Sequence, residues 1–578
     1  MHDLVIRHGT VIDGAGGPPV DADVAVDGGQ VTAVGTVTMR GREEVDARGL
    51  VVTPGFVDVH THYDGQVTWD PLVTPSIWHG VTTVVMGNCG VGFAPAAPDR
   101  REWLIGLMEG VEDVPGVSLR EAIRWEWGSV AQYLDALERF PRAIDVGAQV
   151  PHGAVRAYVM DERGAANEPP TDADLAAMAA IVRDGVAAGA LGFSTNRLPL
   201  HRAVDGRQVP GTFAEEDELF ALGRAVRAGS PGADAVFSLI LPTSTGYDPD
   251  AWDGELEWIS RLSTETGLAF TFPFGASPDG SQQWRARLAQ VEQHNRAGAR
   301  LVLQVGCRRQ ALLCGLQTHH PFEGRPSYAG VASLPIPERA RRLADPEMKA
   351  TILSETNAPG ASRLGELMLD QADAVFPFDD PNDHEPSPEK SLAAACQRTG
   401  RAAADLLYDM TIADDGQSLV MFLLGGYPGS LDASLELMPH PDTVLGLGDG
   451  GAHVSLICDA GYPTYVLGYW ARDRERGRLS LPAAVKVLTS EPARLYGMHD
   501  RGLVAPGRKA DLNVLDPDRV SLCPIEVVHD LPAGAKRVLQ RANGYAATVV
   551  AGEVVQRDGD DTGARPGRVV RGPQPAPR

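Results

Sequence analysis

The stretch Val57-Asp58-Val59-His60-Thr61-His62, which follows the turn Thr53-Pro54-Gly55, decides the fold class of this 578-residue chain. A tight turn followed by an apolar run is typical of a β-strand. Residues two apart on a strand point to the same face, so His60 and His62 would project side by side. Neutral apolar residues would normally fill a buried strand, whereas two imidazoles at this spacing suit a single metal ion. The stretch therefore predicts a strand with a metal-binding end.

The composition excludes several classes of function. The formal net charge of −24 argues against nucleic acid and anionic membranes as partners. Apolar residues make up 43% of the chain, but no run is long enough to span a bilayer. Residues 1–6 lack the features of a signal peptide, and the six scattered cysteines do not predict a disulfide framework. We expect a soluble cytoplasmic protein that acts on a small molecule, and homo-oligomers are left open.

Strand patterns at the two ends flank a long alternation of strands and helices. The first fifty residues and Ala510–Leu515 with Ala547–Val555 indicate short strands, which together suffice for a β-sandwich. The alternation between them indicates a parallel sheet, and we favour a closed (β/α)8 TIM-like barrel over an open sheet. Residues 559–578, rich in Gly, Pro and Arg, predict a surface or partly disordered tail. We expect residues 1–54 to form the N-terminal part of the sandwich and residues 55–490 to form a metal-dependent barrel with insertions. Residues 491–578 would form the C-terminal part of the sandwich and the tail.

Two helix starts can be placed from capping patterns. Thr171 with Asp174 resembles a capping box, and Gly189 would end that helix. Thr212 with Glu215 predicts the cap of the next helix in the same way. Both helices belong to the strand–helix alternation of the expected barrel.

A third candidate residue stands at the end of a late strand. Residues 442–449 form an apolar run that ends in the carboxylate of Asp449. Active sites of (β/α)8 barrels lie at the C-terminal ends of the strands, and His60, His62 and Asp449 all fall at such predicted ends. These three side chains are therefore expected to meet.

The second predicted strand carries a specific resemblance to a known family. Gly80–Val85 followed by Gly87-Asn88-Cys89-Gly90 resembles the N-acyl-D-amino-acid deacylase (D-aminoacylase) branch of the amidohydrolase superfamily. Leu488–Arg494 and Arg501–Leu512 resemble the return of that family from barrel to sandwich, and the similarity covers nearly the whole chain. The resemblance implies hydrolysis of a carbon–nitrogen bond and a zinc ligand at Cys89. Judged from its residue type alone, Cys89 is equally a small buried hydrophobic residue.

The chain departs from the family pattern at two ligand positions. The resemblance implies histidine ligands at the ends of barrel strands 4 and 5, which we match to Ala235–Pro242 and Leu268–Phe274. Neither segment contains histidine. The donors that remain suit one Zn²⁺ ion, with Fe²⁺ or Mn²⁺ as alternatives, and they leave a coordination position for water. These donors are His60, His62, Asp449 and, as a further candidate, Cys89.

Asp449 is the candidate catalytic residue as well as a ligand. Its carboxylate can take a proton from water and pass it to a leaving nitrogen, whereas its structural alternative is to cap the loop 448–451. The resemblance also implies an arginine after strand 8 that holds a substrate carboxylate, but residues 453–463 contain none. The substrate-binding candidates are therefore His152, His453 and Arg308, with Arg197, Arg202 and Arg309 as further cations. His152 is equally well explained as an interior histidine whose nitrogens are hydrogen-bonded within the protein.

Three functions stay open from the sequence. The leading hypothesis is a metal-dependent amidohydrolase that cleaves an amide, N-acyl or cyclic amide bond of a small molecule. A second uses the same metal site on an ester or on a carbon–carbon bond beside a carbonyl. A third is a non-catalytic scaffold, which the two absent histidines favour and which His60, His62 and Asp449 oppose. The substrate and its stereochemistry are not encoded in any motif.

Overall fold

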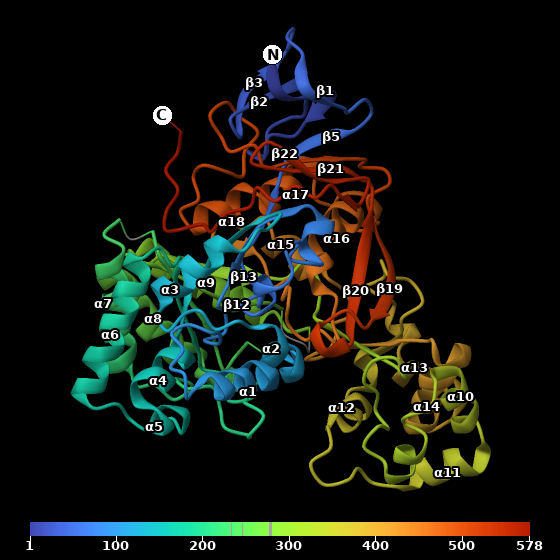
Figure 1. Cartoon of the computed structure of the whole chain (residues 1–578). Coiled ribbons are helices and arrows are strands. Elements are labelled where there is room, and N and C mark those ends of the chain that lie inside the picture. The colour runs from blue at the N-terminus through green and yellow to red at the C-terminus, as the bar shows by residue number, and fades with distance from the viewer. Residues whose placement is uncertain (233, 245–246, 277–279, 578) are drawn as a thin grey trace.

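A computed structural model describes residues 1–232, 234–244, 247–276 and 280–577 of the chain. A β-region formed by the two ends of the chain lies at the top of Figure 1, above an α/β body, and a helical lobe projects at the lower right. Every helix within the described residues is too short or too polar to cross a membrane.

Both ends of the chain contribute to one large sheet, which we call the terminal sheet. Its strand order is β23-β22-β21-β18-β5-β1-β2-β3, with β4 beside β1. The two ends meet where β5 runs antiparallel to β18. The pairing of the termini in one sheet is thus observed, whereas a two-layered sandwich with the boundaries given above stays a prediction. The strands are β1 (His2–Val11), β2 (Val20–Asp27), β3 (Gln30–Gly35), β4 (Gly41–Asp46), β5 (Val51–Pro54), β18 (Leu512–Leu515), β21 (Tyr545–Val550), β22 (Glu553–Arg557) and β23 (Asp560–Asp561).

The central body is built on parallel strands in two runs, β6-β7-β8 and β9-β10-β11-β12-β13-β17. Every residue of β7, β10 and β11 is buried, as expected for parallel strands covered on both faces. The predicted α/β class is confirmed. The strands are β6 (Phe56–Asp58), β7 (Val81–Met86), β8 (Asp145–Ala148), β9 (Val150–Pro151), β10 (Gly192–Asn196), β11 (Val236–Ile240), β12 (Ala269–Phe274), β13 (Leu301–Val305) and β17 (Thr443–Leu445).

Two strand assignments from the sequence need correction. β8 and β9 are one strand interrupted at Gln149, which makes β10 the fourth strand in chain order. The segments that we matched to strands 4 and 5 are therefore strands 5 and 6, namely β11 and β12, and their ends still lack histidine. The first strand, β6, stops at Asp58, so His60 and His62 follow the strand instead of lying within it.

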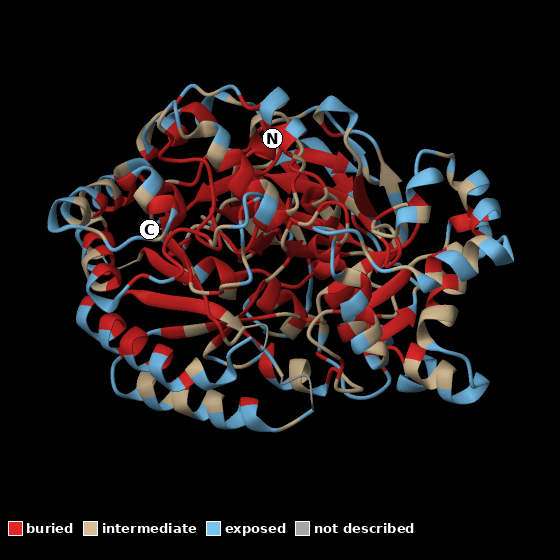
Figure 2. Cartoon of the chain, turned by 90° about the horizontal axis from the view of Figure 1, so that it is seen from below, coloured by how far each residue is buried: buried red, intermediate tan, exposed pale blue. Residues whose placement is uncertain are grey.

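Helices cover the outside of the central strands. α6 (Asp172–Ala187) begins with the predicted capping box, because the side chains of Thr171 and Asp174 each bond the other's backbone N–H. Figure 2 shows the pattern that results, with buried strands inside and helices exposed on their outer faces. The other helices of the body are α1 (Arg101–Glu112), α2 (Gly116–Ala122), α3 (Val130–Arg139), α4 (His152–Met160), α5 (Glu162–Ala165), α7 (Glu216–Gly229), α8 (Trp252–Thr266), α9 (Gln283–Arg296), α15 (Asp432–Leu437), α16 (Tyr462–Tyr465), α17 (Leu481–Leu488) and α18 (Ser490–Leu495).

The predicted cap of α7 is wrong. The N-cap residue is Glu215, and its side chain makes no capping hydrogen bond. The hydroxyl of Thr212 donates to the carbonyl of Val209 instead, at 2.7 Å. The threonine therefore stabilises the preceding turn, and α7 starts one turn later than the pattern predicts.

An insertion between β13 and β17, which we call the insertion lobe, has its own hydrophobic core. Its three-stranded antiparallel sheet, in the order β14-β16-β15, packs against helices around Phe376, Leu407 and Phe422. Val538 belongs to the same cluster and comes from the hairpin β19 (Ser521–Val528) and β20 (Arg537–Asn543). The hairpin thereby ties the lobe to the C-terminal part of the chain. The lobe comprises β14 (Ala311–Cys314), α10 (Ile336–Leu343), α11 (Pro346–Ser354), α12 (Leu364–Asp370), β15 (Val375–Pro377), α13 (Leu392–Thr399), α14 (Ala403–Gly416) and β16 (Val420–Leu423).

The C-terminal tail is built into the body, so the prediction of a surface or partly disordered tail is wrong around residue 570. The backbone N–H of Val570 donates to the Val146 carbonyl at 2.8 Å. Its side chain is 3% exposed and packs with the buried cluster of Val57, Val236 and Val444. Val146, Val236 and Gly189, whose carbonyl accepts from the N–H of Gly572, lie near or just before the N-terminal ends of β8, β11 and β10, so the tail closes the end of the body opposite to the strand C-termini.

Candidate metal centre

Four potential ligand atoms meet just beyond the C-terminal ends of β6, β7 and β17. His60, His62 and Cys89 each place one such atom within 4.8 Å of the other two. Cys89 Sγ lies 3.5 Å from His60 Nε2 and 3.9 Å from His62 Nε2. Asp449 Oδ1 lies 3.4 Å and 3.8 Å from the same two nitrogens. The side chains that the sequence selected therefore lie together.

The spacing of these atoms fits one ion of the size of zinc. A tetrahedral site with bonds of about 2.0–2.3 Å places neighbouring ligand atoms about 3.3–3.8 Å apart. The distances from Cys89 Sγ and Asp449 Oδ1 to the two Nε2 atoms span 3.4–3.9 Å, and His60, His62 and Cys89 form the group whose ligand atoms all lie within 4.8 Å of one another. Two imidazoles, a thiol and a carboxylate are also donor types that zinc prefers. His60, His62 and Cys89 thus fit a single divalent cation by both distance and chemistry, and Asp449 lies close to the two imidazoles as a further donor.

A side chain from another element lies beside the Nδ1 atom of each imidazole. His60 Nδ1 lies 2.7 Å from Gln304 Oε1 on β13, and because an amide oxygen only accepts, Nδ1 carries the proton. His62 Nδ1 lies 3.3 Å from Glu112 Oε1 at the end of α1. In His60, Nε2 then has its lone pair free and directed at the centre, which is the usual arrangement of metal-binding histidines.

The backbone around the centre is held in uncommon conformations. Cys89 and Asp449 have φ values of 54° and 45°, in the left-handed region that non-glycine residues rarely adopt. The N–H of Asp449 donates to the His60 carbonyl at 3.1 Å, and the N–H of His62 donates to the Gly450 carbonyl at 2.7 Å. Gln310 Nε2 donates to Asp449 Oδ2 at 3.2 Å. These bonds fix the loop after β17 against the residues that follow β6.

Acidic groups gather here in surroundings of low polarity. Burial raises the pKa of the Cys89 thiol and of the Glu112 carboxyl well above their ordinary values. Burial also raises the pKa of Asp58 to about 8 and that of Asp64 to about 7. Among the described residues, none of these four groups is ion-paired with a lysine or arginine. A bound cation would favour their charged forms, so the electrostatics also suit a metal.

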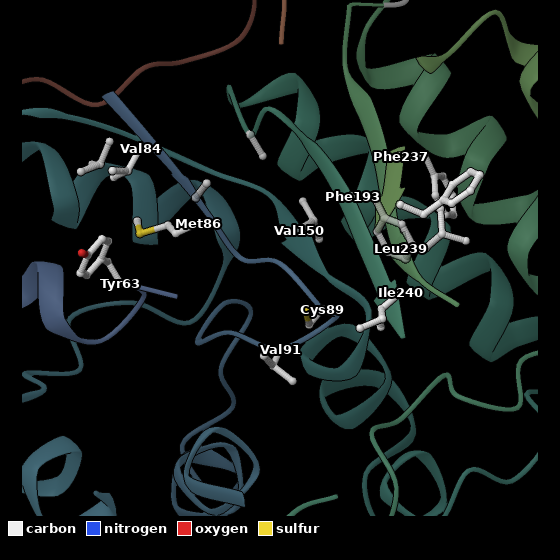
Figure 3. Packing of buried hydrophobic residues seen from close by; sticks show 14 of the residues in the cluster. Tyr63, Val84, Met86, Cys89, Val91, Val150, Phe193, Phe237, Leu239 and Ile240 are labelled. Carbon is white, nitrogen blue, oxygen red and sulfur yellow. The ribbon is translucent and has the colours of Figure 1, made fainter. Parts of the chain in front are cut away.

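The surroundings of Cys89 are otherwise apolar. Cys89 belongs to the same buried cluster as Val91 and Ile240, and Figure 3 shows it among the apolar side chains of that cluster. A small pocket lies beside Asp449 and is lined by parts of the loop 449–460 and by residues 537–540 of β20. The thiol is thus enclosed by apolar side chains, whereas Asp449 borders this pocket.

Of the predicted substrate-binding histidines, one borders the centre and one does not. His453 lies in the loop after Asp449, has a 30% exposed side chain and places Nε2 3.9 Å from Glu112 Oε2. His152 is fully buried at the start of α4, and its two nitrogens lie 2.8 Å from the Thr195 hydroxyl and 2.9 Å from Glu218 Oε1. Both nitrogens of His152 are thus engaged by protein groups. A substrate role stays a prediction for both residues.

Arg308 is tied to the protein around it. Its Nε donates to Asp459 Oδ1 at 3.2 Å, one terminal nitrogen donates to the Cys458 carbonyl, and the guanidinium lies 5.2 Å from the ring centre of Tyr465. Only 3% of the side chain is exposed. A role of Arg308 in substrate binding stays a prediction. A substrate that bound Arg308 would have to share its guanidinium with Asp459.

Sequence reasoning missed four residues near the centre: Glu112, Gln304, Gln310 and His201. His201 follows the end of β10, where Asn196 Nδ2 lies 2.7 Å from its Nδ1, and burial, with His453 and His60 nearby, lowers its pKa to about 3. Gln304 is a polar residue inside a buried strand, and His201 and Gln310 follow the ends of strands. These positions in the sequence could have identified the three residues as candidates for the site. Nothing in the sequence of α1 marks Glu112.

Comparison with known proteins adds independent observations. The family described as "Amidohydrolase family" matches residues 43–556. N-acyl-D-aspartate deacylase of Alcaligenes xylosoxydans xylosoxydans is 27% identical over 572 residues, which cover 98% of this chain and 95% of that protein. N-acyl-D-glutamate deacylase of the same organism is 29% identical over 585 residues, with 97% and 98% coverage. The similarity therefore extends along nearly the full length of both relatives.

Solved structures share the fold. A D-aminoacylase studied for its binuclear metal centre aligns with a TM-score of 0.65 at 23% identity, covering 99% of this chain and 100% of that one. N-acyl-D-glutamate deacylase of Bordetella bronchiseptica, complexed with zinc and a phosphonate inhibitor, aligns with a TM-score of 0.62 at 24% identity and covers 99% of each chain. At this level of identity the likeness concerns the architecture.

Proposed function

This chain belongs to the amidohydrolase family, and from that premise we propose that it is a metal-dependent hydrolase that cleaves the amide bond of an N-acyl amino acid. The observation that carries the proposal is the meeting of His60, His62 and Cys89 within 4.8 Å of one another, with Asp449 Oδ1 at 3.4 Å and 3.8 Å from the two imidazole nitrogens. Relatives named as deacylases of N-acyl-D-amino acids support the choice of bond.

We also infer that the parallel strands close into a (β/α)8 barrel. Counting β8 with β9, the first strand is β6 and the eighth is β17. Beyond the ends of these two strands, Thr61 forms a parallel bridge with Gly450, and the backbone hydrogen bonds of His62 and Asp449 cross the same seam. The fold of the D-aminoacylase structure supports the same closure.

The proposed cofactor is one Zn²⁺ ion. His60, His62, Cys89 and Asp449 would hold it, and a soft thiolate favours zinc over Mn²⁺. A second ion has no comparable group of ligands among the described residues, since β11 and β12 end without histidine. When bound, the ion supplies Lewis acidity that polarises a carbonyl group and makes a water molecule more acidic.

Asp449 would move the protons of the reaction. Its Oδ1 faces the two imidazoles, and its Oδ2 is held by the amide of Gln310. A proton from the attacking water would pass to Oδ2 and then to the nitrogen that leaves, which is general acid–base catalysis worth about 10²–10⁴-fold. The hydrogen bond from Gln310 would fix the position of that oxygen while the proton is transferred.

A substrate carboxylate needs a cationic partner, and the structure narrows the choice. Arg197 and Arg308 are already ion-paired with buried carboxylates, and Arg202 is exposed. Arg309 is half-buried, donates to the Ala276 carbonyl and has no carboxylate partner among the described residues. Burial lowers its pKa, which an anion beside it would offset. Of these four arginines, Arg309 is the one that is neither exposed nor paired with a carboxylate among the described residues, and by this elimination we propose it as the partner for the carboxylate of an N-acyl amino acid.

Metal analysis combined with a substrate screen tests the proposal. Protein purified without chelators should carry about one zinc ion per chain and hydrolyse N-acyl-D-amino acids faster than neutral aromatic amides. His60→Ala should lose both the metal and the activity, and Arg309→Ala should raise KM for carboxylate substrates alone. A metal-free protein without chelator-sensitive activity would favour a scaffold instead. Faster turnover of an ester would move the assignment to another bond.

A further inference from the structure

Glu112 is a buried carboxylate with a histidine on each side. Its Oε1 lies 3.3 Å from His62 Nδ1, and its Oε2 lies 3.9 Å from His453 Nε2. The side chain is 3% exposed. Glu112 Oε1 and His62 Nδ1 lie 3.3 Å apart, and neither has a hydrogen-bond partner within the usual geometric limits. No arginine or lysine in the described part of the chain pairs with this carboxylate.

A buried carboxylate without such a partner is costly, so its position calls for a function. The end of α1 that carries it is fixed by two contacts with the loop after β17. The Glu112 carbonyl accepts a hydrogen bond from the N–H of His453, and the carboxylate of Asp113 accepts one from the hydroxyl of Ser455. These contacts hold the Glu112 side chain between the metal centre and the loop that also carries Asp449.

We propose that Glu112 is a positioning residue that orients His62 for metal binding and ties it to His453 at the rim of the centre. Its Oε1 would accept the Nδ1 proton of His62, which leaves Nε2 for the ion, while Oε2 lies within ion-pair distance of the imidazole of His453. The inference rests on the proposed function, because it concerns the same metal. Outer partners of this kind change metal affinity or activity by about 10–100-fold.

The experiment is a zinc titration of metal-stripped protein in four forms: wild type, Glu112→Leu, Glu112→Gln and the control Glu109→Gln. Leucine fills a similar volume without an acceptor, and glutamine restores an acceptor oxygen for His62. Glu109 serves as the control because it lies on the same helix and is 35% exposed. Its carboxylate makes one long contact, at 4.0 Å, with the guanidinium of Arg120. We expect about 10–100-fold weaker zinc binding in Glu112→Leu, near-normal binding in Glu112→Gln and unchanged binding in Glu109→Gln.

The melting temperature of the metal-free proteins separates positioning from a structural role. If Glu112 positions ligands, replacing a buried carboxylate by leucine should leave the metal-free protein at least as stable as wild type. A metal-free Glu112→Leu protein that melts lower or does not fold would overturn the inference in favour of a structural role. Wild-type zinc affinity in that variant would overturn it too, with the proposed function intact. A wild-type protein that binds no zinc would overturn the proposed function itself.

Discussion

Three structural constraints act on Asp449, whose side chain is largely buried. Its backbone has a φ of 45°, its Oδ1 faces two imidazoles, and its Oδ2 accepts a hydrogen bond from Gln310. Strained backbone of this kind persists only where the surrounding structure enforces it, and it concentrates at functional sites. The loop alternative, in which Asp449 only caps its own turn, does not explain why both oxygens are directed at side chains from other segments.

Asp449→Asn tests the proton-transfer role. Asparagine keeps the shape and can still meet Gln310, but its amide cannot take a proton at the same atom. We expect kcat to fall about 10²–10⁴-fold. The measurement is steady-state kinetics together with the zinc content of each preparation, since kcat should be compared per bound ion. A variant with full zinc and unchanged kcat would contradict the assignment of Asp449 as the base.

At the residue scale, the sequence reveals a site residue only where that residue and its neighbours along the chain form a recognisable pattern. His60 and His62 are recognisable because a His-x-His pair at the end of an apolar strand is a short pattern, and Asp449 because it ends another such run. Glu112 and Gln304 reach the same histidines from α1 and β13, more than 40 residues away along the chain. Their contacts exist only after the strands are arranged in space, so no local pattern predicts them.

At the element scale, helix starts provide a matched pair of capping sites. Thr171 at the start of α6 accepts from the N–H of Asp174, whereas Glu215 at the start of α7 makes no side-chain cap. Thr171→Ala should lower the free energy of unfolding by about 0.5–2 kcal/mol, and Glu215→Ala by much less. Urea denaturation of both variants checks this. Equal losses would show that the capping box contributes nothing specific.

The strand order shows where element-level prediction fails. The buried strands are recognisable as apolar runs, and β7, β11 and β12 lie where the sequence places them. The ranks predicted for β11 and β12 are one too low, because β10 precedes them as the fourth strand. A strand's rank is a property of the whole sheet, which single runs do not contain. The absence of histidine at the ends of β11 and β12 is unaffected by this error.

At the scale of the whole molecule, the tail connects regions that are far apart in sequence. Its composition resembles a disordered segment, yet the N–H of Arg568 donates to Asp145 Oδ1 at 2.8 Å, and Val570 is buried. Asp145 Oδ2 accepts from Arg501 at 2.6 Å and from Lys509 at 2.7 Å. One buried carboxylate thereby joins β8, the segment that precedes β18, and the tail. Composition could not predict this, because the partners belong to other parts of the fold.

The charge of Asp145 makes this junction sensitive to acid. Burial alone would raise the pKa of Asp145, but Lys509 and Arg501 outweigh it and lower the pKa to about 2. A lowered pKa contributes stability that is present above the ordinary value of about 4 and is lost as the pH falls toward 2. Asp145→Asn should therefore destabilise the protein by about 3–5 kcal/mol at pH 6, and the difference from wild type should shrink below pH 4. Unfolding curves at several pH values check this; a constant difference would contradict it.

The buried tail also predicts that stability and metal binding can be separated. Val570 packs at the N-terminal ends of the strands, whereas the metal centre lies beyond their C-terminal ends. Val570→Ala removes two buried methyl groups and should lower the free energy of unfolding by about 1.5–2 kcal/mol, at about 0.8 kcal/mol per group. Zinc affinity should stay at the wild-type level. Val20→Ala, at a position that is 58% exposed, serves as the control and should change neither quantity. A Val570→Ala protein with wild-type stability would mean that the packing of the tail does not contribute to the stability of the body. Weakened zinc binding would mean that the two ends of the strands are energetically coupled.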